Sequence, residues 1–374
     1  MFQFDSKAHL QGDLMRAALL RNIGDEALEV RDDIGLVDVG PGEVKVKIAA
    51  TGVCHSDLSC MNGTIPQPAP SVLGHEGAGI IAEVGEGVTD VKVGDHVIVA
   101  WSPPCGECAY CGPRHQPNLC SNIQMVMGGT PHFTLDGNPV FGMAGAGTFA
   151  EEMIIPHQGV VKIDDDIPME IGSLIGCGVM TGVGAAINTA KITPGSSVVV
   201  FGCGGVGISC IQGARVAGAS VIVAVDLNDQ KLEDAKRFGA THACRPEELD
   251  SLKASLTGGD GFDYALEAIG LPATMRASYD AIRRGGTACI VGVGKLDEFV
   301  SFSAFELFFS EKNLIGSYYG SADVRTDFHK LLGFWKDGQL DLEGMITRRI
   351  KLDEINDAFA AMQRGEVIRQ VISF

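Results

Sequence analysis

The chain has 374 residues, of which 45% are hydrophobic and 20% charged, and its 29 basic and 47 acidic residues give a net charge of −18. This acidic balance excludes most nucleic-acid-binding proteins, which need a basic face, and disfavours an anionic membrane surface. The first residues, MFQFDSKAHLQGD, lack the pattern of a secretory signal, and no uninterrupted apolar run is long enough to span a bilayer. We therefore expect a cytoplasmic protein of two domains that binds neither nucleic acid nor membrane.

The eleven cysteines favour metal binding over disulfides. Without a secretory signal the chain is expected in a reducing compartment, where thiolates more often hold metals than pair with one another. Four of the cysteines crowd into residues 105–120, and the others are scattered. The crowded segment is therefore the first candidate for a metal site.

The first third of the chain has the pattern of a β-rich domain. Residues 15–50 alternate between apolar and polar, and VKVKIAATG at 44–52 predicts a strand, as do the runs at 78–84 and 96–100. Residues 122–147 contain Gly, Pro, Met and Asn without a clear period, and we interpret them as a long ordered loop.

From about residue 168 the pattern changes to alternating helices and strands. β-Branched runs at 198–202, 221–226, 263–267 and 287–293 are separated by helical stretches, which predicts βαβ units and a parallel sheet. A strand at 313–318, helices at 324–337 and 353–364, and a final strand in VIRQVISF complete the prediction.

Residues 196–226 read as strand, glycine-rich turn, helix, strand and acid. The turn contains Gly202, Gly204, Gly205 and Gly207, and Asp226 lies 24 residues after Gly202. In this context the glycines allow a tight turn, close approach of a pyrophosphate and packing of helix on strand, while the helix N-terminus binds phosphate. A carboxylate at position 226 can bond the ribose hydroxyls and repels a 2′-phosphate, which predicts NAD rather than NADP.

The cysteine-rich segment has the spacing Cys105-x2-Cys108-x2-Cys111-x8-Cys120. Four thiolates so spaced form a closed tetrahedral zinc site, whose role is structural because no position is open to a substrate. A four-iron cluster also uses C-x2-C-x2-C spacing and is the alternative.

A second possible metal site is dispersed along the sequence. Cys54, His75 and Cys177 offer two sulfurs and one nitrogen. Three protein ligands leave the fourth position of a zinc ion open, which is the arrangement of a catalytic site.

These motifs together resemble the zinc-dependent medium-chain alcohol dehydrogenases, in particular the longer and usually dimeric members. The resemblance covers essentially the whole chain and rests on GHEGAGIIAEVGEGV at 74–88, the four-cysteine segment, CGVMTGVGAA at 177–186 and FGCGGVG at 201–207. It implies an α/β fold in which a doubly wound Rossmann sheet is combined with a β-rich GroES-like catalytic domain. The catalytic domain is expected at 1–178, with a zinc lobe at 101–121, the NAD domain at 179–321, and a return to the catalytic domain at 322–374.

The resemblance also implies roles for individual residues, along with two zinc ions per subunit and NAD. The catalytic zinc is expected on Cys54, His75 and Cys177, with Glu76 beside it, and the structural zinc on the four clustered cysteines. Ser56 is expected to bond the substrate oxygen, Asp57 to hold His75, and His55 to lie near the pyrophosphate and the proton path. Positions expected to contact the cofactor, besides His55, are Thr181, Gly202, Gly204, Gly205, Val206, Gly207, Asp226, Lys231, Ala268, Ile269, Val291, Gly292, Val293, Ser317 and Arg369.

Trp101 and Ile65 correspond to positions in the substrate channel, so we expect apolar primary alcohols or aldehydes of medium length or aromatic type. The alternatives are a nicotinoprotein with permanently bound NAD, a dehydrogenase of S-(hydroxymethyl)thiol adducts of formaldehyde, and a zinc-stabilised binding protein without catalysis. The resemblance further implies a homodimer, formed through the region of Phe299 to Ala304 and the ELFF stretch at 306–309.

Overall fold

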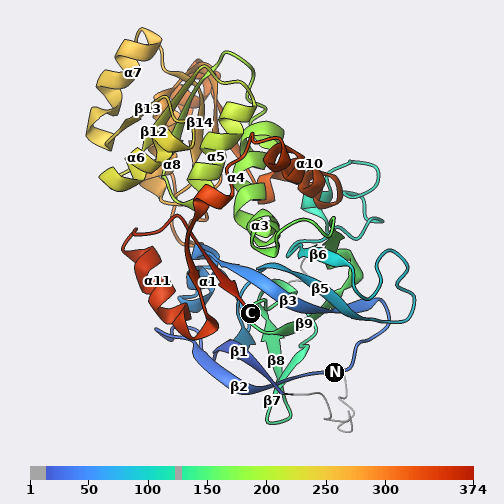
Figure 1. Cartoon of the computed structure of the whole chain (residues 1–374). Helices are drawn as coiled ribbons and strands as arrows, with labels where there is room; N and C mark the ends of the chain where they lie inside the picture. The colour runs from blue at the N-terminus through green and yellow to red at the C-terminus, as the bar shows by residue number, and fades with distance from the viewer. Residues whose placement is uncertain (1–13, 123–128) are drawn as a thin grey trace.

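The structure is a computed structural model that describes residues 14–122 and 129–374. The segment used to argue against a secretory signal therefore lies outside the described residues, as does part of the predicted loop at 122–147. A β-rich part occupies the lower half of the view in Figure 1, and a parallel sheet with its helices occupies the upper half.

The β-rich part contains a small barrel and a larger sheet. The barrel runs in the order β1 (Met15–Leu20), β2 (Glu29–Leu36), β7 (Phe133–Leu135), β8 (Asn138–Gly142) and β4 (Ser71–Val72). The larger sheet runs β10 (Val160–Lys162), β6 (His96–Val99), β5 (Glu76–Val84), β3 (Glu43–Val53), β18 (Arg369–Ser373) and β17 (Ile346–Ile350), and β9 (Glu152–Pro156) also pairs with β3. Because β18 pairs with β3, the end of the chain lies beside its beginning.

The parallel sheet has the strand order β13, β12, β11, β14, β15, β16. These strands are β13 (His242–Cys244), β12 (Val221–Val225), β11 (Ser197–Phe201), β14 (Phe262–Glu267), β15 (Ile282–Ile290) and β16 (Asn313–Gly316). The intervening helices are α5 (Gly205–Val216), α6 (Asp229–Arg237), α7 (Leu249–Thr257) and α8 (Pro272–Ala281). This is the strand order of a Rossmann fold, with its switch point between β11 and β14. The predicted fold class is confirmed.

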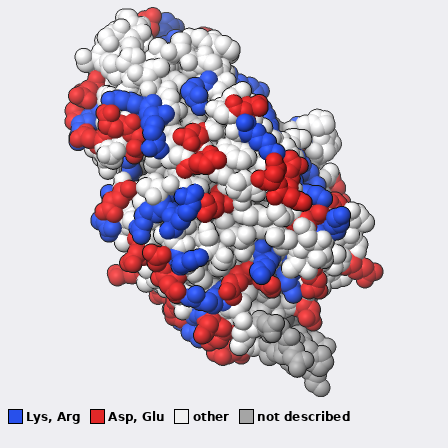
Figure 2. All heavy atoms as spheres, viewed as in Figure 1, with Lys and Arg blue, Asp and Glu red and all other residues white. Residues whose placement is uncertain are grey.

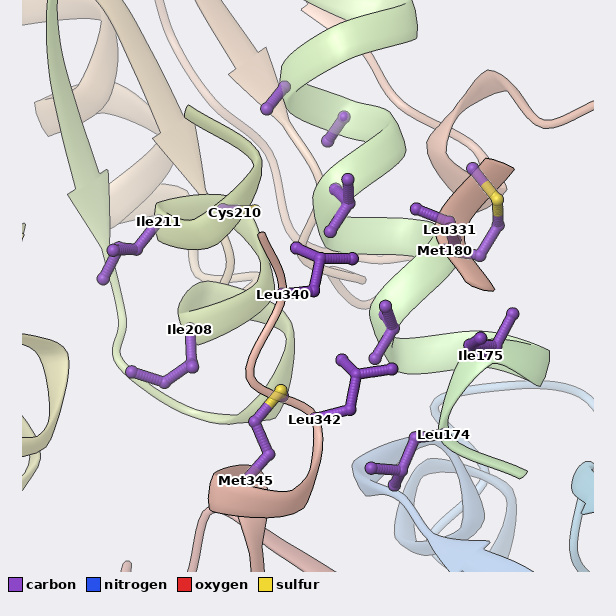
Figure 3. Close-up of a cluster of buried hydrophobic side chains, with 14 of the residues drawn as sticks. Leu174, Ile175, Met180, Ile208, Cys210, Ile211, Leu331, Leu340, Leu342 and Met345 are labelled. Carbon is purple, nitrogen blue, oxygen red and sulfur yellow. The ribbon is translucent and has the colours of Figure 1, made fainter. Parts of the chain in front are cut away.

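A single irregular helix at Met169–Thr189 packs on α5, the helix that follows the glycine-rich turn. It consists of α3 (Met169–Leu174), a π-helical segment η4 (Ile175–Val179), α4 (Met180–Gly184) and a second π-helical segment η5 (Ala185–Thr189). In Figure 3 its residues Leu174, Ile175 and Met180 lie in one buried cluster with residues of α5, of α10 (Val324–Lys336) and of the segment 340–345. The helix is long and apolar enough to cross a membrane, but 83% of its most apolar window is buried inside the protein, as in a core helix.

The remaining α-helices of the described residues are α1 (His55–Met61), α9 (Ala304–Ser310) and α11 (Ile355–Gln363). The loop prediction at 122–147 was wrong over 133–142, where β7 and β8 form a hairpin. An Asp136-Gly137 turn joins them, and its positive φ angles suit the right-handed twist of a hairpin. The short strands β13 and β17 were not predicted.

Candidate active site

The first candidate metal site is built at the N-terminus of α1. Cys54 is the N-cap of this helix, and the buried Asp57 accepts a hydrogen bond from the Cys54 amide at 2.9 Å. Asp57 Oδ1 also lies 3.2 Å from the Gly74 amide and 3.2 Å from His75 Nδ1. One buried carboxylate therefore fixes both the helix that carries Cys54 and the ring of His75.

The ligand atoms of Cys54, His75, Glu76 and Cys177 all lie within 4.8 Å of one another, and all four residues are buried. His75 Nε2 is buried and has no hydrogen-bond partner within the described part of the chain. An imidazole whose Nδ1 is held by a carboxylate and whose Nε2 is free is the form that binds a metal. The donor set of two thiols and one imidazole fits zinc, with Cys177 supplied by the π-helical segment η4.

Asp57 also sets the electrostatics of His75. Burial lowers the pKa of His75, but the charge of Asp57 and their hydrogen bond outweigh it and raise the pKa to about 10. A carboxylate in this position makes the imidazole a stronger donor to a metal. Burial raises the pKa of Asp57 itself.

Glu76 and Arg369 form a buried ion pair behind the metal site. Glu76 Oε1 also accepts a hydrogen bond from the Gly178 amide at 3.2 Å, so both oxygens of this carboxylate have protein partners. Arg369 reaches from Glu76 to Gly205 at the start of α5, where a Cβ on residue 205 would collide with the arginine side chain. The arginine thus lies between the candidate metal site and the glycine turn, where a pyrophosphate is expected.

Ser56 and the ring of Trp101 lie beside the candidate metal site, and Trp101 contacts two further aromatic rings. Ser56 is half-buried, and its Oγ lies 3.6 Å from Cys54 Sγ. Trp101 presents an edge to His75 with ring centroids 6.3 Å apart, stacks obliquely with Tyr319 at 4.4 Å and meets Tyr318 edge-on at 5.6 Å. The two tyrosines were not among the predicted site residues, although their position directly after β16 at the carboxyl edge of the sheet could have identified them.

The second candidate metal site is the four-cysteine lobe. The sulfurs of Cys105 and Cys111 lie 4.0 Å apart and those of Cys108 and Cys120 lie 3.9 Å apart, too far for disulfides. Four sulfurs about 2.3 Å from one tetrahedral ion are about 3.8 Å apart, so the spacing fits zinc and leaves no room for a four-iron cluster. The amides of Cys105, Cys108 and Cys111 each lie 3.4 Å from a cysteine sulfur, which stabilises thiolates.

The dinucleotide side lies at the carboxyl ends of β11 and β14. Gly202 has a φ of 90°, and a Cβ on Gly207 would collide with the Gly202 carbonyl, so helix α5 packs tightly on the turn. The Cβ direction of Gly204 meets no atom within 4 Å, which leaves space for a phosphate at the helix N-terminus. Asp226 Oδ2 accepts a hydrogen bond from the Cys203 amide at 2.8 Å, so the acid follows β12 beside the turn as predicted.

The other expected cofactor contacts lie along the same edge or beside it. The amide of Ala268 donates to the Phe201 carbonyl at 2.9 Å, and those of Val291 and Gly292 donate to the Glu267 carbonyl. Ile269 and Val293 are exposed, as apolar residues at a ligand-binding edge often are. His55 is exposed at the start of α1, Val206 and Thr181 are half-buried, and Lys231 lies on α6.

Glu267 is a further residue that the sequence analysis missed. It is fully buried at the end of β14, and its Oε1 accepts hydrogen bonds from the amides of Ile269 and Gly270 and from the Thr274 hydroxyl. It therefore orders the loop that carries Ala268 and Ile269. The sequence signal that could have identified Glu267 is its position as an acidic residue at the end of the run 263–267.

The charge of Asp226 gives a direct prediction on cofactor choice. Asp226→Asn keeps an acceptor for the Cys203 amide but removes the negative charge, so the ratio of kcat/KM for NADP to that for NAD should rise about tenfold or more. Steady-state kinetics with both cofactors measures this ratio, and Asp229→Asn on the exposed side of α6 is the matched control. An unchanged ratio would remove Asp226 from cofactor selection.

Comparison with known proteins agrees with this geometry. Residues 40–165 match the alcohol dehydrogenase GroES-like domain and residues 205–337 the zinc-binding dehydrogenase domain. The chain is 39% identical to S-(hydroxymethyl)glutathione dehydrogenase of Paracoccus denitrificans, over 96% of this chain and 99% of the relative. It superposes on benzyl alcohol dehydrogenase from Acinetobacter calcoaceticus with a TM-score of 0.89 at 32% identity, covering 96% of this chain and 99% of that one. A zinc-binding dehydrogenase from Sinorhizobium meliloti, solved with NADP, gives a TM-score of 0.79 at 27% identity, covering 96% and 99%.

A Rossmann sheet beside a β-rich part, with one four-cysteine site and one buried site of two cysteines, a histidine and a glutamate, defines the class of zinc-dependent oxidoreductases that use a nicotinamide dinucleotide. The chain belongs to the zinc-dependent medium-chain alcohol dehydrogenase family. It is thus an NAD-dependent enzyme with a catalytic and a structural zinc, and the alternative of a binding protein without catalysis is not supported.

Proposed function

We propose that the enzyme interconverts apolar primary alcohols, aromatic or of medium length, with their aldehydes, using NAD. The observation that carries the proposal is the aromatic cluster beside the candidate catalytic site, in which Trp101 contacts Tyr318 and is backed by the buried Tyr319. Ile65, the other predicted channel residue, packs against a hydrophobic cluster that also contacts Trp101. Aromatic and aliphatic side chains bind the apolar part of a substrate, and the polar groups at the metal end of the channel fix the orientation of that substrate.

The residues divide the chemistry between them. When bound, zinc on Cys54, His75 and Cys177 polarises an alcohol oxygen, and NAD accepts the hydride. Ser56, half-buried next to Cys54, is placed to accept the hydroxyl proton. His55, the neighbouring residue in the chain, is the proposed acceptor of that proton from Ser56, and partial desolvation lowers the pKa of its imidazole, which favours the neutral form that a proton acceptor needs.

The second candidate is oxidation of S-(hydroxymethyl)glutathione, the substrate in the name of the Paracoccus relative. That substrate carries carboxylates, which a channel would have to match with cations. Trp101 and Ile65 supply no cation to the channel, and the lack of positive charge at these two positions favours an apolar substrate over the glutathione adduct.

The test is an assay of NADH formation with benzyl alcohol, hexan-1-ol and S-(hydroxymethyl)glutathione, with the zinc content measured on the same sample. We expect kcat/KM for benzyl alcohol to exceed that for the glutathione adduct by about 100-fold, since an apolar site leaves carboxylates unpaired. The opposite order would establish the second candidate. Failure of all substrates, together with NAD that is released only on denaturation, would indicate a nicotinoprotein.

We also propose that the enzyme is a homodimer formed through α9 and β16. β16 is the edge strand of the parallel sheet, and the apolar side chains nearby include Phe299, Phe305 and Phe308, which are 81%, 68% and 77% exposed. Residues 299–303, which the family resemblance places in the interface, form no strand here and so do not themselves extend the sheet. An isologous interface would cover both the strand edge and these rings.

Light scattering at micromolar concentration should therefore give twice the mass of 39.4 kDa, and Phe308→Asp should shift it toward the monomer. Leu296→Asp, a similarly exposed apolar position outside α9, is the comparison variant. A monomeric wild-type protein would rule the interface out.

A further inference from the structure

The segment that follows β16 has an unusual backbone. Tyr319, Gly320 and Ser321 are consecutive and all left-handed, with φ angles of 53°, 65° and 51°. Glycine adopts this conformation freely, but tyrosine and serine are disfavoured there because of their Cβ atoms. A turn of this kind persists only where its surroundings hold it, and such turns cluster at functional sites.

The contacts that hold the turn come from the helix at 169–189. Thr189 Oγ1 lies 2.9 Å from Ser317 Oγ and 2.7 Å from Ser321 Oγ, so one hydroxyl joins both ends of the turn. Asn188 Nδ2 donates to the Gly320 carbonyl at 3.3 Å, and the Tyr319 hydroxyl donates to the Gly176 carbonyl. We call Thr189 with Ser317 and Ser321 the Thr189 clamp.

The clamp depends on the irregular helix. Thr189 is the last residue of the π-helical segment η5, and Gly176 lies in the π-helical segment η4 that carries Cys177. A π turn inserts one extra residue and so changes which side chains face a neighbour, which is why such turns are frequent at functional sites. At Gly184 and Gly320, where an added Cβ would collide, helix and turn meet backbone to backbone.

The clamped turn lies between the two halves of the active site. On one side the Ser317 amide donates to the Ile290 carbonyl at 2.8 Å, at the carboxyl edge of the parallel sheet. On the other side Tyr319 stacks on Trp101, which faces His75. A nicotinamide ring that delivers hydride near the metal has to lie in this interval, because the dinucleotide binds along the sheet edge.

We propose that Thr189 is a positioning residue for the nicotinamide half of the cofactor, because its hydroxyl fixes the segment 317–321, which contains the left-handed turn 319–321 and against which the ring binds. The proposal rests on the proposed function and on the expectation, implied by the family resemblance, that Ser317 lies beside the nicotinamide. It assigns Thr189 no contact with the adenosine half, which lies toward Asp226 and Ile269.

The test compares two ligands, NADH and ADP-ribose, by titration calorimetry on the zinc-loaded enzyme. ADP-ribose has the adenosine and pyrophosphate but lacks the nicotinamide. Thr189→Val removes the hydroxyl at nearly constant shape, and we expect the Kd for NADH to rise about tenfold while that for ADP-ribose changes less than about twofold. Thr326→Val, an exposed threonine of α10, is the matched control and should change neither Kd.

Rescue distinguishes positioning from a general loss of stability. In Thr189→Val/Ser321→Gly the turn no longer carries the Cβ penalty at residue 321, so NADH affinity should recover at least in part. Thr189→Ser keeps the hydroxyl and should bind NADH like the wild type. If Thr189→Val is unstable, Ser321→Ala removes one partner hydroxyl instead and should show the same selective loss for NADH.

Equal losses for NADH and ADP-ribose, or no loss for either, would overturn the proposal. A wild-type enzyme that binds neither ligand would instead contradict the proposed NAD-dependent function.

Discussion

Replacing Cys177 by serine should abolish alcohol oxidation and reduce the zinc content from two ions per chain to one. The sulfur of Cys177 belongs to the buried group with Cys54, His75 and Glu76. A serine hydroxyl is a poor zinc ligand compared with a thiolate. Without the zinc ion, the buried Nε2 of His75 has no bonding partner among the described residues. Lewis-acid polarisation contributes several kcal/mol to such reactions, so kcat/KM should fall by about 1,000-fold or more.

The control for this variant is Cys210→Ser. Cys210 is a fully buried thiol on α5 that belongs to neither cysteine group, so the same chemical change there should leave both zinc ions and most of the activity in place. Zinc is measured by atomic absorption on protein that has passed a desalting column. Full activity with two zinc ions in Cys177→Ser would show that this thiol is not a ligand.

Replacing Cys108 by serine should remove the other zinc ion and destabilise the lobe without emptying the catalytic site. The sulfur of Cys108 lies 3.9 Å from that of Cys120, and hydrogen bonds, first from the amide of Cys111 and then from Ser121, lower the pKa of Cys108 to about 5. Binding of structural zinc stabilises zinc-finger peptides by on the order of 10 kcal/mol, so even a fraction of that energy should lower the unfolding midpoint by about 5 to 10 °C.

Trypsin provides the local readout for this second variant. Arg114 is exposed within the lobe, between Cys111 and Cys120. Cleavage after Arg114 should be slow in the wild type and fast in Cys108→Ser, because the backbone has to leave its folded shape to enter the protease. Ala109→Ser, an exposed residue of the same lobe, should behave like the wild type. Loss of the lobe should also reduce activity, since Trp101 lies only four residues before Cys105. Equal cleavage rates in Cys108→Ser and wild type would contradict a structural zinc in this lobe.

Much of the architecture could be predicted because its signals are local. The β-branched runs at 198–202 and 221–226 flank a glycine turn and a helix, and both form interior strands of the parallel sheet. The hairpin at 133–142 was missed because β7 and β8 are short and lie in a segment without a clear period. Its Asp-Gly turn was the available signal. The three-residue strand β13 is similarly too short to show a period.

The site was predictable where a motif fixes the residue types, and not where it depends on packing. The four cysteines and the group of Cys54, His75 and Cys177 come together in the fold. The pairing of Arg369 with Glu76 joins residues 293 positions apart, and no sequence pattern shows it. Nor does any pattern show the clamp by Thr189, because it depends on π-helical turns and a left-handed turn that are set by tertiary contacts.

The irregular helix at 169–189 has a consequence for how this family can vary in sequence. In a regular helix successive side chains are about 100° apart, so the loss of one residue rotates everything beyond it by that angle. A single deletion within α4, the α-helical stretch that joins η4 to η5, would therefore turn Thr189 to another face relative to Cys177, away from Ser317 and Ser321. The number of residues between Cys177 and Thr189 is therefore constrained as strictly as the identities of these two residues.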